Sequence, residues 1–154
     1  MDARMFHKYR FKFYLNASHY IIINGRQGDV HPHTWEIIIE VLILKKEFVE
    51  FNIFERSIER FFQQYQNQTM NNIPPFNTIM PTLENLVEYF GQEIRILLRK
   101  EGGELTQIEG SETPTRTYII TYEHDAEFSD SIEAMTKDSV DDMLGKMLDN
   151  ATKH

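Results

Sequence analysis

The chain has 154 residues, of which 41% are apolar, and it carries a formal net charge of −8. That is enough apolar content for the core of one ordinary domain, and the lack of cysteine excludes disulfides, thiolate metal ligands and a cysteine nucleophile. The chain is acidic and has no basic stripe, so we do not expect it to bind nucleic acid. It also has no long apolar span and no signal-peptide start, so we expect a cytoplasmic protein without a membrane partner.

Two stretches near the start have the pattern of strands. The segment YRFKFYLN at 9–16 alternates apolar and polar residues, which is the period of a half-buried strand. The segment HTWEIIIEVLIL at 33–44 is rich in β-branched residues and places Glu36 and Glu40 on one face. We expect the opposite, apolar faces to hold Tyr9, Phe11, Phe13 and Leu15 in the first strand and Trp35, Ile37, Ile39, Val41 and Ile43 in the second. We interpret the residues between the strands, which include Asn24, Gly25 and Gly28, as a loop.

Two helices are predicted next, because apolar residues recur at helical spacing from Phe54 and again from Leu83. The second helix has clear boundaries: Thr82 can cap its start, and two glycines at 102–103 end it. Two strand-like stretches follow, ELTQIEGSE at 104–112 and TRTYIITYE at 115–123. The order β β α α β β indicates an α+β domain in which an antiparallel sheet carries its helices on one face.

The last part of the chain differs in charge from the rest. From Glu123 to His154 nine acids and three lysines give −6, which leaves −2 for residues 1–122. We therefore divide the chain into a domain at 1–124 and an acidic tail at 125–154. Apolar residues recur loosely at helical intervals and predict one or two amphipathic helices in the tail; they are Ile132, Met135, Val140, Met143, Leu144 and Met147.

A pair of histidines, His31 and His33, opens the second predicted strand. Residues i and i+2 of a strand point to the same face, so two imidazoles can reach one point. His19, at the far end of the first strand, lies beside them if the two strands are antiparallel neighbours. Three neutral imidazoles that leave one position open are the arrangement of catalytic zinc. The alternative is that these are ordinary surface or strand-pairing histidines.

Several motifs together resemble the 6-pyruvoyltetrahydropterin synthase and 6-carboxytetrahydropterin synthase family. They are FYLNASH at 13–19, HPHTWEI at 31–37, VEF at 49–51, PTLEN at 81–85 and ETPT at 112–115. They occur in the family's order and cover roughly residues 9–122. The resemblance implies the tunnelling fold (T-fold), in which four-stranded sheets pair between subunits into a barrel. It therefore also implies a homo-oligomer, a trimer or a hexamer.

The resemblance further implies the residues of a site. His19, His31 and His33 would hold Zn²⁺, and the carboxylate of Glu112 would anchor a pterin substrate. Such an anchor is physically sound, because the 2-amino and N3–H donors of a pterin form a fork that one carboxylate meets with two parallel hydrogen bonds. Thr113 would add a hydroxyl to the same pocket. Glu109 is the nearest competitor for the anchoring role, and Glu112 could also be an ordinary solvated residue.

The chain departs from the family pattern at its catalytic positions. Members carry a catalytic cysteine shortly before the histidine pair, where this chain has Gln27, and an Asp-His dyad, where it has Gln66 and Asn67. Amides cannot act as a general acid or base near neutral pH. Asp29 is the only ionisable carboxylate in the loop that leads to His31, and we take it as the replacement base. The alternative is that Asp29 only ends the turn.

Two classes of function follow. One is a zinc-dependent lyase that acts on 7,8-dihydroneopterin triphosphate or a related pterin, of the 6-pyruvoyl- or 6-carboxytetrahydropterin synthase type. The other is a catalytically silent protein that keeps the zinc and the pterin pocket and has an interaction or regulatory role. Purified protein with zinc should form a new pterin product only in the first case.

Overall fold

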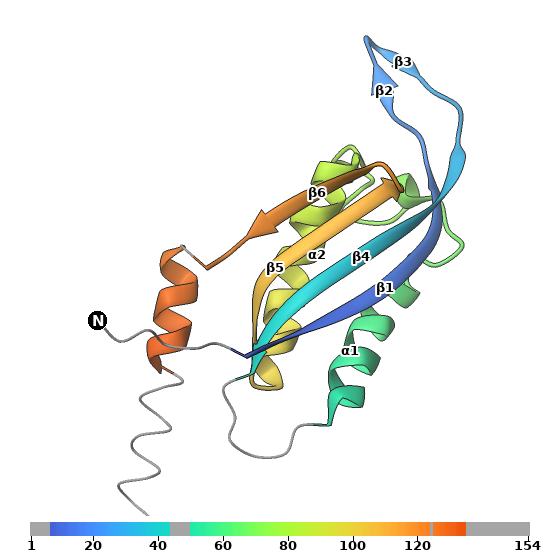
Figure 1. Ribbon diagram of the computed structural model, residues 1–154. Coiled ribbons are helices and arrows are strands. Elements are labelled where there is room, and N and C mark those ends of the chain that lie inside the picture. Colours follow the sequence, from blue (N-terminus) through green and yellow to red (C-terminus); the bar gives the residue numbers. More distant parts are fainter. Residues whose placement is uncertain (1–6, 44–49, 124, 135–154) are drawn as a thin grey trace, which may run out of the picture.

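A computed structural model describes residues 7–43, 50–123 and 125–134. The main sheet has four antiparallel strands in the order β1-β4-β5-β6, and two helices lie against one of its faces (Figure 1). The predicted α+β class, sheet and element order are confirmed. No helix in the described part of the chain is long and apolar enough to cross a membrane. The elements are β1 (Lys8–His19), β2 (Ile22–Ile23), β3 (Arg26–Gln27), β4 (His31–Ile43), α1 (Phe51–Gln63), a 3-10 turn (Met70–Asn72), α2 (Leu83–Lys100), β5 (Gly103–Thr113) and β6 (Arg116–Thr121).

The segment between β1 and β4 is not the simple loop that we expected. β2 and β3 pair there as a small antiparallel hairpin, which projects from the end of the main sheet in Figure 1. Asn24 and Gly25 connect the two strands with positive φ angles of 52° and 75°. This is the geometry of a type I′ turn, for which Asn-Gly is the preferred pair. The Asn-Gly dipeptide was therefore a hairpin signal in the sequence.

The strand β4 lies in the middle of the domain, and its apolar face is the centre of the core. Trp35, Ile37, Ile39 and Val41 are fully buried, as their alternation predicted. The pairing with β5 shifts register between Glu40 and Val41, where it passes over Thr106 of β5, but the pairing with β1 is unbroken and the alternation of β4 continues. Ile43 is accordingly half buried against the main core, and Leu42 lies on the opposite face of β4, where it is buried in a separate cluster. Similarly, Tyr9 at the start of β1 is 47% exposed, although the other apolar residues of its face are buried.

Both predicted helices are present and cover the core face of the sheet. α1 buries Phe54, Ile58 and Phe62, which are spaced by four residues. The hydroxyl of Thr82 accepts a hydrogen bond from the backbone N–H of Asn85 at 3.2 Å, so the predicted helix cap is confirmed. α2 packs closely on β5, because a Cβ at Gly110 would lie only 2.3 Å from the Val87 side chain. The core residues of α2 are Leu83, Leu86, Val87, Phe90, Ile94 and Leu98.

A short helical segment at 126–134 packs at the end of the sheet opposite the hairpin (Figure 1). Phe128 and Ile132 of this segment form a buried cluster with Leu42 of β4. Ion pairs join the start of the segment to α2, where Arg95 contacts Asp125 at 2.9 Å and Glu127 at 3.2 Å. The rest of the predicted amphipathic tail, from Met135 to Met147, lies outside the described residues. The boundary at residue 124 stays a prediction.

Candidate metal centre

Three histidines meet where β1 and β4 pair. His19 and His31 are direct partners in the antiparallel register, and His33 lies two residues further along β4 on the same face. Their ligand nitrogens all lie within 4.8 Å of one another. His19 is fully buried, whereas His31 and His33 are half buried. The two strands are therefore the antiparallel neighbours that a shared site requires.

Backbone carbonyls determine which nitrogen two of the imidazoles present. The Nδ1 of His19 lies 2.7 Å from the carbonyl oxygen of Pro81, and the Nδ1 of His31 lies 2.9 Å from that of Asp29. A carbonyl oxygen only accepts, so each Nδ1 carries the proton and donates it. In neutral rings the Nε2 atoms then hold lone pairs, and these two atoms face each other at 2.9 Å.

Two lone pairs at this distance cannot form a hydrogen bond and repel each other unless a cation lies between them. Ligand nitrogens around tetrahedral zinc, each about 2.0 to 2.1 Å from the metal, are about 3.3 Å apart. The separation of the Nε2 atoms of His19 and His31 is close to that value. Carbonyls that hold the far nitrogens are also the usual partners of metal-binding histidines. The donor set therefore fits a zinc ion.

The buried histidine is held in its metal-binding form. Burial lowers the pKa of His19, and nearby His31 and His33 lower it further, although the Pro81 carbonyl and Glu112 act in the opposite direction. A lowered pKa means that the neutral ring is favoured near neutral pH. Neutral imidazole is the form that binds a metal.

Glu112 reaches this cluster from the neighbouring strand β5. Its Oε1 lies 4.0 Å from the Nε2 of His19 and accepts a hydrogen bond of 3.1 Å from the indole N–H of Trp35. Glu112 also lines a pocket of about 370 Å³, together with Arg116, Tyr118 and residues at the start of α2. The competing carboxylate, Glu109, instead accepts a bond from Gln107. Glu109 pairs with Ile38 of β4, which lies on the opposite face from His33 and Trp35, so Glu109 faces away from the histidines.

The other expected substrate residue, Thr113, is placed less favourably. It is exposed, its hydroxyl lies 3.3 Å from that of Thr115, and it is not among the residues that line the Glu112 pocket. Asp29 is close to the cluster, but it contacts His31 through its backbone carbonyl. The carboxylate of Asp29 is on an exposed residue beside the site.

The residues at the family's catalytic positions do not come together around the histidines. Gln27 is exposed in β3, where it pairs with Ile22. Gln66 binds the edge of β1: its amide oxygen accepts from the backbone N–H of Asn16 at 2.9 Å, and its amide nitrogen donates to the carbonyl of Tyr14 at 3.0 Å.

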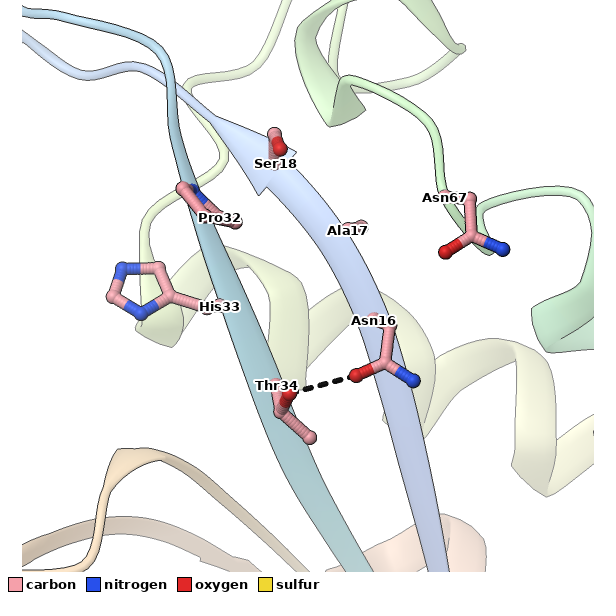
Figure 2. Close-up of a pocket in the computed structure, with 7 residues that line it drawn as sticks. All are labelled: Asn16, Ala17, Ser18, Pro32, His33, Thr34 and Asn67. Atoms are coloured by element: carbon pink, nitrogen blue, oxygen red, sulfur yellow. Dashed lines mark hydrogen bonds between the residues drawn. The ribbon is translucent and has the colours of Figure 1, made fainter.

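Asn67 lines a second pocket, of about 430 Å³, that includes His33 and the polar pair Asn16 and Thr34. Figure 2 shows that pocket along β1 and β4, with the hydroxyl of Thr34 donating to Asn16 at 2.7 Å. In the same view His33 and Asn67 lie on opposite sides of the strand pair. Asn67 is therefore near the cluster, but its amide is not directed at His33.

Two contributors to the site were not identified from the sequence. Trp35 was interpreted as a core residue, and it is fully buried, but it also holds Glu112. The carbonyl of Pro81 fixes the tautomer of His19 from the loop before α2. The only sequence signal for Trp35 was its position two residues after His33, on the same face of the strand.

The sheet, the helices and their order define a T-fold domain, and comparisons with known proteins agree. The C. elegans 6-pyruvoyl tetrahydropterin synthase superposes with a TM-score of 0.65 at 11% identity, over 79% of this chain and 99% of that one. The Plasmodium falciparum enzyme superposes with a TM-score of 0.53 at 12% identity, over 75% and 98%. A search of curated protein sequences finds no match.

The family assignment comes from the sequence itself. The family described as 6-pyruvoyl tetrahydropterin synthase matches residues 8–123, which span β1 to the end of β6. The chain belongs to this family. The sequence resemblance found from the motifs alone is thereby confirmed, over nearly the same residues.

Proposed function

We propose that the chain binds one zinc ion through His19, His31 and His33 and acts on a pterin, as a lyase of the 6-pyruvoyl- or 6-carboxytetrahydropterin synthase type. One observation carries the proposal. The Nε2 atoms of His19 and His31 face each other at 2.9 Å while both Nδ1 atoms donate to backbone carbonyls. This arrangement is unfavourable without a cation and well suited to one.

The pterin would be held by Glu112. Its carboxylate lines a pocket and lies 4.0 Å from a proposed zinc ligand, so a ring bound there would have its side chain within reach of the metal. The pocket volume of about 370 Å³ lies in the range of small-molecule sites. The substrate that we propose is 7,8-dihydroneopterin triphosphate or a related pterin, since the family's solved members are named for a tetrahydropterin product.

Zinc, when bound, would polarise a hydroxyl or carbonyl of the pterin side chain and make its protons more acidic. The chain itself must then move those protons. Asp29 is our candidate for this role, because it is an exposed carboxylate two residues before His31. The carbonyl of the same residue holds His31, so Asp29→Asn should leave the metal site intact while it removes the base.

The structural role of Gln66 favours a second candidate function, one without catalysis. Both ends of its amide are engaged with the backbone of β1, so this position serves the sheet edge. Because the family's dyad position is used structurally here, a silent zinc- and pterin-binding protein with a regulatory role is the alternative. Asn67 likewise offers no ionisable group.

The test is a turnover assay. Zinc-loaded protein incubated with 7,8-dihydroneopterin triphosphate should yield a new fluorescent pterin on chromatography, and Asp29→Asn should abolish that product while zinc content is unchanged. Binding of the pterin without any product would favour the silent alternative. Product that persists in zinc-free Asp29→Asn protein would contradict the mechanism, although the chain would still be an enzyme.

A further inference from the structure

Trp35 lies between the two halves of the proposed site. It follows His33 by two residues on β4, and the pairing of Glu36 with Ser111, extended by one residue, places Trp35 opposite Glu112. Its ring meets that of His19 edge to face, at 5.0 Å and 84°, and lies 5.1 Å from that of His33. One buried side chain therefore contacts two proposed metal ligands and the proposed pterin anchor.

The indole N–H explains why a tryptophan suits this position better than another large apolar residue. A buried indole needs an acceptor for its single donor, and the Oε1 of Glu112 provides it at 3.1 Å. If the carboxylate turned away, the N–H would be left unpaired in a buried site, which is unfavourable. The bond therefore restricts the orientation of the Glu112 carboxylate.

This restriction leaves the carboxylate able to bind a ligand. An ionised carboxylate has about four lone-pair sites, and Trp35 takes one of them on Oε1. Within residues 7–43, 50–123 and 125–134, no other side chain is found to donate to Glu112. Each oxygen thus keeps room for one donor of a two-pronged ligand such as a pterin, provided that the carboxylate plane is held steady.

We propose that Trp35 is a positioning residue: its N–H sets the orientation in which Glu112 receives the two parallel donors of a pterin, and its ring couples that orientation to His19 and His33. The inference rests on the proposed function, since it assumes a ligand of this kind at Glu112. It adds that metal and pterin binding are coupled. A metal ion that fixes the two imidazoles also fixes the indole packed against them, and hence the carboxylate.

The first test needs no ligand. Trp35 is the only tryptophan in the chain, so ¹⁵N-labelled protein has a single indole N–H resonance. We expect this resonance to move upfield in Glu112→Ala and to shift when zinc is added to the wild type. Glu109→Ala, on the opposite face of β5, is the matched control and should leave it in place. An indole resonance that Glu112→Ala does not move would overturn the proposal.

The second test measures pterin affinity in a double-mutant cycle. The Kd of neopterin is determined by calorimetry for the zinc-loaded wild type, Trp35→Phe, Glu112→Ala and the double variant. We expect Trp35→Phe to weaken binding about tenfold, as for loss of one hydrogen bond to a charged group, and to have no further effect once Glu112 is absent. Zinc content should be the same in all four proteins.

The outcomes separate the two proposals. If Trp35→Phe weakens neopterin binding equally with and without Glu112, or does not weaken it in the wild type, Trp35 only fills the core. If Trp35→Phe does not fold, the single tryptophan can be replaced by benzothienylalanine, which keeps the ring shape and lacks the N–H, with the same expectation. A zinc-loaded wild type that binds no neopterin would instead overturn the proposed function, while the indole resonance would still report the contact with Glu112.

Discussion

The carbonyls of Pro81 and Asp29 decide which nitrogen His19 and His31 present, and this makes the metal site the most directly testable feature. We expect the purified wild type to contain about one zinc per chain by elemental analysis. His31→Ala or His33→Ala should abolish it, because two ligands rarely hold zinc tightly. His7→Ala removes an exposed histidine outside the cluster and should leave the zinc content unchanged. Wild-type protein that binds no zinc would refute the site.

A second prediction concerns Gln66, whose amide both donates to and accepts from the backbone of β1. Gln66→Glu keeps the shape but replaces the donor with an oxygen that faces the carbonyl of Tyr14. We expect a loss of about 1 to 2 kcal/mol in the free energy of unfolding, measured with urea. Gln68→Glu adds the same charge to an exposed residue of the same segment and should have little effect. Equal stability of both variants would show that the Gln66 contacts contribute nothing.

The residue-scale features that sequence could predict were those set by local spacing. His31 and His33 share a face because strand alternation requires it, and His19 followed from the pairing of two adjacent strands. The contact between Trp35 and Glu112 joins residues 77 positions apart, and it depends on the register between β4 and β5. Gln66 likewise acts on a strand 50 positions earlier. Such registers are set by the packing of the whole sheet.

At the scale of elements, hydrophobic period and capping residues were sufficient to predict both helices and the four main strands. They did not indicate what covers the other face of the sheet. Alternation places Leu42 on the face of β4 that carries Glu36 and Glu40 and predicts a solvent-exposed surface there, whereas Leu42 is buried in a separate cluster. That surface is covered by Phe128 and Ile132 from beyond the proposed domain boundary.

Cutting the chain after residue 124 tests that boundary. The truncated protein would lose Phe128 and Ile132, which bury Leu42, and the acidic partners of Arg95. We expect it to keep its zinc and its sheet but to lose about 2 kcal/mol of stability in urea, from the apolar contacts removed. Phe128→Ala in the full chain measures how much these apolar contacts contribute to stability, because it leaves the ion pairs in place. A truncated protein that does not fold or does not bind zinc would place the segment within the domain.

The ion pairs of this segment predict a dependence on pH. Hydrogen bonding to Arg95 lowers the pKa of Asp125 from its ordinary value, and hydrogen bonding to Arg99 lowers that of Glu127. The buried carboxylate of Glu104 lies in the same network and competes for both arginines. A lowered folded-state pKa adds stability above the ordinary pKa, and this stability is lost as pH falls through the folded value.

The stability advantage of the full chain over the truncated one should therefore be constant from pH 6 to 8 and shrink below about pH 4.5. Urea midpoints of the two proteins, measured in parallel, give that difference directly, because shared effects on the histidines cancel. The change should be small, since both carboxyl groups are largely exposed. An advantage that grows on acidification would contradict the assigned ion pairs.

For the molecule as a whole, the two edge strands of the sheet matter most, because their outward backbone groups can pair with another chain. Segment 66–69 already covers the C-terminal part of β1. There the backbone N–H of Asn67 donates to the carbonyl of Asn16 at 2.6 Å, and that of Ser18 donates to the carbonyl of Gln68 at 2.8 Å. Alternate residues of an edge strand direct their backbone groups outward, so among the described residues Lys8, Arg10 and Lys12 form the remaining open part of that edge. β6 forms the other edge.

Open edges on both sides favour pairing between copies, and a ring closes when each β1 pairs with the β6 of a neighbour. The family resemblance implies that this ring is a trimer or a hexamer, and sedimentation experiments at micromolar concentration should detect it. Lys12→Pro removes an outward N–H without removing a bond to β4, so it should shift the protein toward monomers, whereas Lys12→Ala keeps the N–H and should remain assembled. A monomeric wild type would contradict the barrel, and an assembled Lys12→Pro variant would show that the subunits meet through another surface.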